Sequence, residues 1–212
     1  MNLPRVILAD DHKMLLEAFR KLLESHCEIV ATVADGRALL HVAATLKPDI
    51  IVLDIGMPLL NGLEAARQLK SKMPAVKIIF LTMQEDPDLA VEAMCCGASG
   101  YLLKTSAPAE LLHAIQEALK DRCHVTPQIA RGMEKSFIRN PEGRRQPKSL
   151  TPRQYEVVQL LAEGKSMKEV ADVLHVTART VAFHKYRSME ELAIQSNAEL
   201  IQFAIKHRMV IA

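Results

Sequence analysis

Five side chains in the first half of the chain could together handle a phosphoryl group. Asp10 and Asp11 follow one short apolar run and Asp54 follows another, while Thr82 and Lys104 stand at the ends of two more. Three carboxylates brought close together repel one another unless a cation or protons intervene. Carboxylate oxygens with open positions suit Mg²⁺, which keeps part of its water shell and meets phosphoryl oxygens.

An aspartate carboxylate can itself accept a phosphoryl group as a covalent nucleophile. A hydroxyl and an ammonium on the same rim can hold the oxygens of a phosphoryl group attached to Asp54. Taken singly, each residue has an ordinary alternative: Asp54 or Thr82 as a cap or turn residue, Lys104 as a solvated charge. Because all five stand at the ends of four different runs, we interpret the whole set as one site.

The elements that must position this set are short apolar runs alternating with amphipathic stretches through residues 1–121. Runs so short and so uniformly apolar are typical of strands buried on both faces. Strands are expected at 6–9, 29–33, 50–53, 78–81 and 100–103, and helices at 13–26, 36–46, 62–72, 87–96 and 108–121.

Five βα repeats predict an α/β fold with a doubly wound, flavodoxin-like parallel sheet. In the strand order 2-1-3-4-5, ligands bind beyond the carboxyl ends of strands 1 and 3, where the order reverses. Asp10, Asp11 and Asp54 are therefore expected in one crevice.

The chain beyond residue 150 is entirely helical in pattern. Thr151 and Gln154 form a capping box with Pro152 at the first helical position, and Gly164 ends that helix. Further helices are expected at about 168–175, at 178–193 capped by Thr177, and from a cap at Asn197 to about Arg208. A compact core is expected from Leu160, Leu161, Val170, Ala171, Leu174, Val181 and Leu192.

The tight turn at residues 175–177 makes this second region a helix-turn-helix, whose later helix would enter the major groove of DNA. The predicted domains are residues 1–122, a linker at 123–148 and the all-α domain at 149–212. The linker includes a short helix opened by Thr126 and Pro127, then a charged stretch with two prolines and a glycine.

The first domain resembles the receiver domain of two-component response regulators over about residues 4–121. The motifs that carry the resemblance are Ala9-Asp10-Asp11-His12, Leu53-Asp54-Ile55-Gly56-Met57-Pro58 with Asn61-Gly62, Leu81-Thr82, and Gly100-Tyr101-Leu102-Leu103-Lys104. It implies that Asp54 accepts the phosphoryl group from a sensor histidine kinase. It also implies that Asp10, Asp11 and Asp54 bind Mg²⁺, together with the backbone carbonyl of Gly56.

The same resemblance implies that Thr82 and Tyr101 move together as a switch, while Lys104 binds the phosphoryl group. The alternative for Tyr101 is a partly buried aromatic of the sheet. Gly56 brings no side chain to the site, and Gln84 occupies another position that influences dephosphorylation in receivers. The lifetime of the phosphoryl group is therefore left open.

The second domain resembles the LuxR-type helix-turn-helix, and the two domains together resemble the NarL/FixJ subfamily of response regulators. The motifs are Leu150-Thr151-Pro152-Arg153-Gln154-Tyr155-Glu156-Val157-Val158, Ala162-Glu163-Gly164-Lys165-Ser166, and Thr180-Val181 with His184. The resemblance implies binding to double-stranded promoter DNA. The candidate DNA-binding residues are Lys165, Ser166, Lys168, Arg179, Thr180, Phe183, His184, Lys185 and Arg187.

The later helix of this motif departs from the family pattern. Ala182, Phe183 and Tyr186 stand where base-contacting or phosphate-contacting residues are common, and Glu190 and Glu191 add negative charge near the helix end. Acidic groups would face phosphate unfavourably unless they are turned away. The alternatives for Arg179 and Lys185 are a solvated helix face, and for His184 a packing role.

The last helix, around residues 198–205, is more apolar than so small a domain requires. In the family the corresponding helix pairs two DNA-binding domains, whereas the alternative is core packing. A homodimer on paired half-sites, favoured by phosphorylation, is the expected assembly.

Composition narrows the class of protein further. Lys and Arg against Asp and Glu number 16 against 17 in residues 1–139 and 11 against 8 in residues 140–212, so only the second part is net basic. No run approaches the roughly 20 apolar residues that span a bilayer, no signal peptide is visible, and a cytoplasmic location without membrane contact is expected. The four cysteines lack metal-ligand spacing and are expected to be reduced and packed.

The leading hypothesis is therefore a phosphorylation-controlled transcription regulator without independent enzyme activity. One alternative is a phosphatase or phosphotransferase that works through an aspartyl-phosphate. Such enzymes often place a second acid two residues after the nucleophile, where this chain has Gly56. A receiver-linked interaction module with weak or lost DNA binding is another, motivated by Ala182, Glu190 and Glu191.

Overall fold

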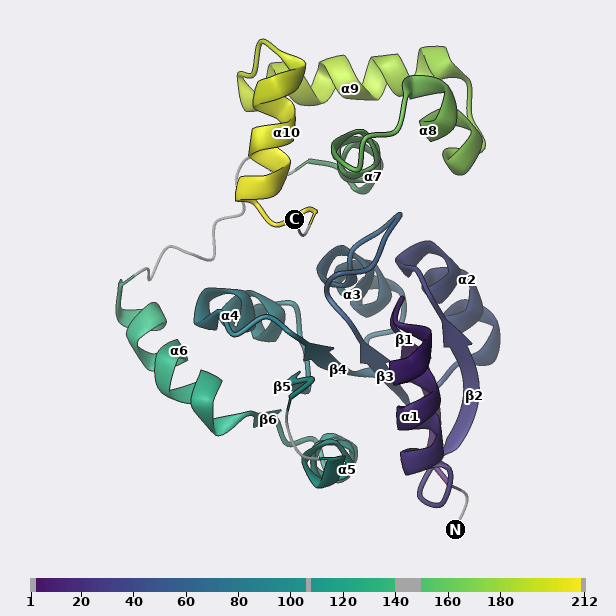
Figure 1. Cartoon of the computed structure of the whole chain (residues 1–212), viewed down its shortest axis with the longest axis vertical. Coiled ribbons are helices and arrows are strands. Elements are labelled where there is room, and N and C mark those ends of the chain that lie inside the picture. The colour runs from purple at the N-terminus through teal and green to yellow at the C-terminus, as the bar shows by residue number, and fades with distance from the viewer. Residues whose placement is uncertain (1–2, 106–107, 140–149, 211–212) are drawn as a thin grey trace. The chain divides into compact units, whose positions relative to one another are not determined.

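The computed structural model describes residues 3–105, 108–139 and 150–210, which form two compact units (Figure 1). The strands of the first unit are β1 (Arg5–Ala9), β2 (Glu28–Val33), β3 (Ile50–Leu53), β4 (Lys77–Thr82), β5 (Gly100–Leu103) and β6 (His124–Val125). Its helices are α1 (Lys13–Leu23), α2 (Gly36–Leu46), α3 (Gly62–Lys72), α4 (Pro87–Cys95), α5 (Pro108–Leu119) and α6 (Pro127–Arg139).

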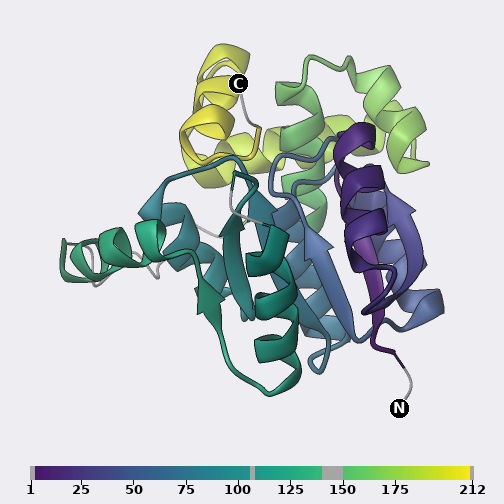
Figure 2. The ribbon, with the colours of Figure 1, turned by 60° about the horizontal axis from the view of Figure 1, so that its bottom comes forward.

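The strands form one parallel sheet in the order β2-β1-β3-β4-β5-β6. This confirms the predicted order 2-1-3-4-5 and adds a sixth strand at the β5 edge. The central strand β3 is buried along its whole length, as its uniformly apolar run indicates. Figure 2 views the sheet from the side that α1 and α5 cover.

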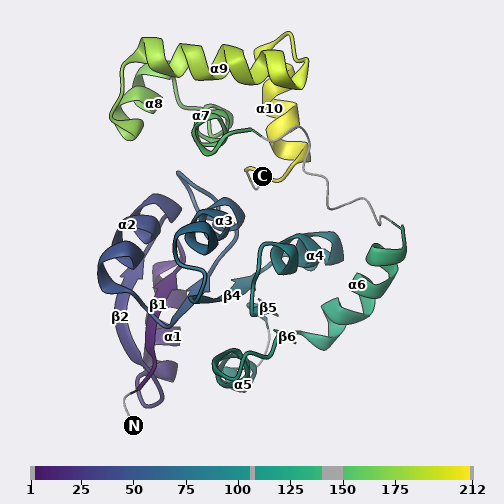
Figure 3. The same cartoon turned by 180° about the vertical axis from the view of Figure 1, so that it is seen from behind.

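Helices cover both faces of this sheet. One core cluster joins Leu16 and Leu23 of α1 and Leu111 of α5 to Val6 and Leu8 of the sheet. On the opposite face lie α2, α3 and α4, as Figure 3 shows from behind. Because successive residues of a strand point to opposite faces, both layers are needed to bury runs such as Ile50–Leu53.

The sixth strand and the helix after it belong to the first unit, although the sequence analysis assigned them to the linker. Tyr101 in β5 pairs with Val125 in β6, and α6 then packs against α4. The contact between these two helices is close, because a Cβ atom on Gly132 would meet Pro87 Cγ at 2.3 Å. The predicted short helix is thus present as α6. The strand β6 was not predicted, because two residues are too few to show the alternation of polar and apolar side chains that indicates a strand.

The second unit consists of α7 (Pro152–Ala162), α8 (Met167–Leu174), α9 (Ala178–Leu192) and α10 (Asn197–Lys206). The capping box of Thr151 and Gln154 is confirmed, and Gly164 adopts a φ of 87° after α7. Two apolar clusters form the core of the unit: Val157, Leu160, Val170, Ala171, Leu174 and Val181 in one, and Val158, Met189, Leu200, Ala204 and Met209 in the other.

Two sequence predictions need correction. Asn197 does not cap the last helix, because the Ser196 side chain accepts the Glu199 N–H and leaves Asn197 as the first helical residue. The cysteines are free, but only Cys27 is buried, while Cys95 and Cys123 are exposed. Adjacent helical positions point apart, so Cys95 and Cys96 could not both face the core.

The charged part of the predicted linker, residues 140–148, lies outside the described residues. The predicted boundary between residues 148 and 149 also lies there and stays a prediction. Within the described ranges, no helix is both long enough and apolar enough to cross a membrane.

Candidate functional site

The carboxyl ends of four neighbouring strands bring the acidic residues and Lys104 together. The Asp54 N–H donates to the Ala9 carbonyl at 2.8 Å, and the Lys104 N–H donates to the Thr82 carbonyl at 2.8 Å, so the strand ends stay level. Lys104 Nζ lies 2.7 Å from Asp10 Oδ2 and 3.0 Å from Asp54 Oδ2. These three side chains are at most 6% exposed, which makes the arrangement a buried ionic cluster.

Asp11 and His12 complete the rim of the cluster. Single ligand atoms from Asp10, Asp11, His12 and Asp54 all lie within 4.8 Å of one another. His12 Nδ1 is 2.9 Å from Asp10 Oδ1 and 3.0 Å from Asp11 Oδ1, so it contacts both leading carboxylates. His12 was not among the predicted site residues, although it follows the two acids directly. The three carboxylates carry more negative charge than the Lys104 ammonium can compensate, and their oxygens could hold Mg²⁺.

Burial dominates the electrostatics of Asp54. Desolvation raises the pKa of the Asp54 carboxyl, the Lys104 ammonium opposes that rise, and the Asp10 carboxylate adds to it. The Ile55 N–H donates to Asp54 Oδ1 at 2.8 Å, and the backbone of Gly56 also hydrogen-bonds this carboxylate. Asp54 is therefore held in one orientation by backbone donors on its own loop.

Gly62 supports this loop from behind. A Cβ atom there would stand 2.1 Å from the Asp54 carbonyl oxygen, so α3 can begin directly against the loop after β3 only with glycine. Gly62 belongs to one of the sequence motifs, but no role was predicted for it. The signal was present as a glycine at the first position of a predicted helix.

Thr82 and Tyr101 meet at one residue of the loop after β4. Thr82 Oγ1 accepts the Gln84 N–H at 3.2 Å, and the Tyr101 hydroxyl donates to the Gln84 carbonyl at 2.8 Å. Thr82 and Tyr101 are both buried, the tyrosine completely. Tyr101 is thus more deeply buried than the predicted alternative of a partly buried aromatic. The two residues predicted to move together are linked through Gln84.

In the second unit, α8 and α9 form the helix-turn-helix. His175 takes a left-handed conformation with φ 53° and ends α8, and the Val176 N–H returns to the Ala171 carbonyl at 3.0 Å. Thr177 then caps α9 by accepting the Thr180 N–H. The left-handed residue reverses the chain within three residues, which gives the tight turn that the sequence predicted.

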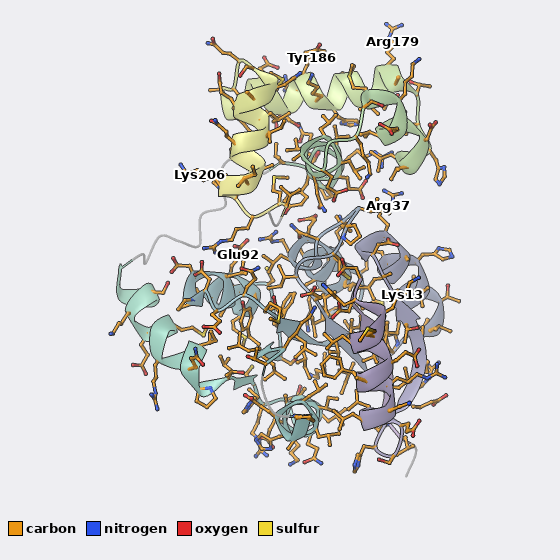
Figure 4. All side chains as sticks on the ribbon, in the orientation of Figure 1. Lys13, Arg37, Glu92, Arg179, Tyr186 and Lys206 are labelled. Carbon is orange, nitrogen blue, oxygen red and sulfur yellow. The ribbon has the colours of Figure 1, made fainter. Side chains whose placement is uncertain are left out.

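Apart from Ala178, the exposed residues of α9 follow one stripe of the helix. The stripe consists of Arg179, Phe183, Tyr186, Arg187 and Glu190, spaced four, three, one and three residues apart. Arg179 and Tyr186 point away from α7 in Figure 4. The helix has the length and the free face that insertion into a major groove requires.

The other predicted DNA-binding residues lie in different surroundings. Ser166 caps α8 in a capping box with Glu169, and Lys165 and Lys168 stand beside it at the start of that helix. Lys185 is only 7% exposed, with its Nζ 5.1 Å from the centre of the Tyr186 ring. His184 packs edge-on against Phe183. Lys185 is therefore not part of the exposed stripe.

The acidic residues at the end of α9 have internal partners. Arg187 pairs with Glu190 at 2.8 Å and with Glu191 at 3.3 Å, and Gln154 Nε2 donates to Glu191 at 2.9 Å. Glu191 is consequently drawn toward α7, whereas Glu190 stays exposed beside the arginine. Much of the negative charge that the sequence placed here is compensated within the helix.

Known families account for both units. Residues 6–116 match the response regulator receiver domain, and residues 148–204 match the LuxR family of bacterial regulatory proteins. The oxygen regulatory protein NreC of Staphylococcus aureus is 31% identical over 214 residues, which cover 97% of this chain and 99% of that relative.

Solved structures of RcsB resemble the chain over both units. RcsB from Salmonella enterica serovar Typhimurium, bound to a promoter in the presence of the phosphomimetic BeF3−, is 28% identical with a TM-score of 0.61. The match covers 95% of this chain and 98% of that one. A structure of two RcsB dimers on two parallel DNAs gives a TM-score of 0.59 at 28% identity, with the same coverage. The chain belongs to the response regulators of the NarL/FixJ type, with a receiver domain followed by a LuxR-type DNA-binding domain.

Proposed function

We propose that a sensor histidine kinase phosphorylates this response regulator on Asp54 and that the modification controls binding of α9 to promoter DNA. The observation that carries the proposal is the position of Lys104 Nζ, within 3.0 Å of both Asp54 and Asp10. An ammonium fixed beside the nucleophile can hold the phosphoryl oxygens as negative charge develops on them.

In the transfer, an Asp54 carboxylate oxygen attacks the phosphorus of a phosphohistidine. A new P–O bond forms as the P–N bond breaks, and the imidazole leaves. Asp10, Asp11 and Asp54, with the Gly56 carbonyl, would hold Mg²⁺, which neutralises phosphoryl charge when bound. The Ile55 N–H keeps the reacting carboxylate oriented throughout.

We expect the structural effect of phosphorylation to be transmitted from the site through Thr82. Its hydroxyl oxygen accepts the Gln84 N–H, and the Gln84 carbonyl accepts the Tyr101 hydroxyl, so movement of Thr82 toward a new phosphoryl group would disturb both contacts. A shift of this loop would therefore change the packing of Tyr101, a fully buried residue of β5.

DNA binding is assigned to α9 and to the beginning of α8. The exposed residues Arg179, Phe183 and Arg187 face outward, and Ser166 and Lys168 lie where a helix N-terminus can meet phosphate. RcsB has been solved as dimers bound to DNA, which supports DNA binding by a homodimer here. We expect phosphorylation to favour this dimer. The proposal includes a cytoplasmic location and no catalytic turnover beyond loss of the protein's own phosphoryl group.

The test is DNA binding and solution mass of the full-length chain with acetyl phosphate and Mg²⁺, on wild type and Asp54→Asn. The wild type should gain affinity or dimerise, whereas the variant should not. If both proteins bind identically, Asp54 is not the control point. If neither binds any duplex under either condition, the alternative of a receiver-linked interaction module replaces this proposal.

A further inference from the structure

The exposed stripe of α9 carries two aromatic side chains at its middle. Phe183 is 65% exposed and Tyr186 is 60% exposed, the highest values among the phenylalanine and tyrosine side chains whose burial the structure describes. Exposed apolar area of this size is costly in water and usually marks a contact surface. The stripe has the character of a surface that an occupant covers.

The charges around the rings favour a polyanion as that occupant. Arg179 stands one turn before Phe183 and Arg187 one turn after it, but Arg187 is paired with Glu190 and Glu191. Arg179 has no ion-pair partner among the residues that the structure describes. A phosphate at the edge of a DNA groove would pair with Arg179.

The chemistry of Phe183 then limits what it can read. A phenyl ring neither donates nor accepts a conventional hydrogen bond, and the apolar group that the major groove presents is the thymine C5-methyl. Phe183 is the sixth residue of α9, within the part of a recognition helix that reaches base edges. The ring is held from the side by His184, with the ring centres 5.4 Å apart.

We propose that Phe183 is a specificity-determining residue that recognises thymine by its methyl group in the major groove, with Tyr186 closing the same apolar surface. The inference rests on the proposed DNA-binding function and adds the base and the group that is read. Tyr186 is itself braced by the Lys185 ammonium, 5.1 Å from its ring centre. Because the His184 ring packs against Phe183, the Phe183 side chain is ordered before it contacts DNA, which reduces the conformational entropy lost on binding.

The experiment removes the methyl group from the DNA and the ring from the protein. Duplexes are first selected from a random pool with the phosphorylated full-length wild type. Affinities are then measured for one selected duplex and for the same duplex with deoxyuridine at each thymidine in turn. Phe183→Ala is assayed on both, with Leu119→Ala as a control for loss of an exposed apolar side chain in the receiver unit.

At one or two thymidines, loss of the methyl group should weaken wild-type binding about fourfold, from roughly 0.8 kcal/mol per buried carbon. Phe183→Ala should weaken binding to the thymidine duplex by at least as much and should not distinguish uracil from thymine. Leu119→Ala should retain the full discrimination. Circular dichroism checks that the variant folds, as expected for a substitution at a 65% exposed site.

The proposal fails if uracil substitution never changes wild-type affinity, or if Phe183→Ala discriminates thymine from uracil as well as the wild type does. A Phe183→Ala variant with unchanged affinity but a lower mass in solution would assign the rings to contact between two copies of the chain. If no duplex is selected at all, the DNA-binding function itself is overturned. Selection of a duplex without a methyl effect overturns only the role of Phe183.

Discussion

Gly132 in α6 faces Pro87 at the start of α4 so closely that a Cβ atom would stand 2.3 Å from the proline Cγ. A rigid ring cannot turn aside, so we predict that Gly132→Ala destabilises the first unit by about 1–3 kcal/mol. Helix propensity alone predicts the opposite sign, a gain of about 0.5–1 kcal/mol. Urea unfolding decides between them, with the exposed Glu134→Ala as a control expected to change little.

Gly62→Ala should be more damaging, because the added Cβ would meet the Asp54 carbonyl oxygen at 2.1 Å. Backbone must move to relieve that overlap, so we expect a loss of about 3 kcal/mol or more in the first unit. Phosphorylation by acetyl phosphate should fall with it. Ser71→Ala, at an exposed position of the same helix, should leave both measurements unchanged. If Gly62→Ala is as stable as the wild type, the loop after Asp54 can shift at little energetic cost and the prediction is wrong.

The raised pKa of Asp54 gives a stability difference that depends on pH. Because the folded carboxyl binds its proton more tightly than the unfolded one, the ionised form destabilises the fold, and that cost disappears as the pH falls through the raised pKa. In the absence of Mg²⁺, Asp54→Asn should therefore be more stable relative to wild type at pH 7.5 than at pH 4.5. Calorimetry of both proteins at both pH values tests the sign, and a difference that grows in acid contradicts it.

Magnesium should stabilise the wild type through the carboxylate cluster. At 100 times its dissociation constant, a single-site ligand adds about 2.7 kcal/mol to the free energy of unfolding. Asp11→Asn removes one candidate ligand, so most of the Mg²⁺-induced rise in Tm should be lost. Asp172→Asn, on an exposed position of α8, should keep the whole rise. An undiminished rise in Asp11→Asn would remove that residue from the metal site.

Two arginines on α9 should differ in their contribution to DNA binding. Arg179 has no ion-pair partner among the described residues, while Arg187 is held by Glu190 and Glu191. We expect Arg179→Ala to weaken binding to all duplexes alike and to lower the salt slope by about 1, as loss of one phosphate contact does. Arg187→Ala should have the smaller effect. Fluorescence anisotropy over a range of salt concentrations measures both, and equal slopes would contradict the assignment.

The sequence was sufficient for the sheet and for the acidic cluster because both depend on local pattern. Runs such as Ile50–Leu53 are apolar throughout, and the topological rule for parallel sheets then brings Asp10 beside Asp54. Lys104 could be placed on the same rim for the same reason. Its contact with both carboxylates depends on burial, which no pattern along the chain discloses.

What could not be predicted depends on tertiary packing. Lys185 is polar, yet packing of α9 against α7 and α8 turns it inward, so its type alone misplaces it. Ser196 and Asn197 are both good caps, and the choice between them follows from where the Glu199 N–H lies. His124 and Val125 form a strand only because β5 offers them an edge.

That two-residue strand also determines how the receiver sheet ends. A long open edge presents unpaired N–H and C=O groups that can recruit a strand from another molecule. β6 is followed at once by Thr126 and by Pro127, which has no N–H to donate, and α6 then turns away along α4. The β5 side of the folded sheet is therefore a poor template for edge-to-edge pairing with another molecule.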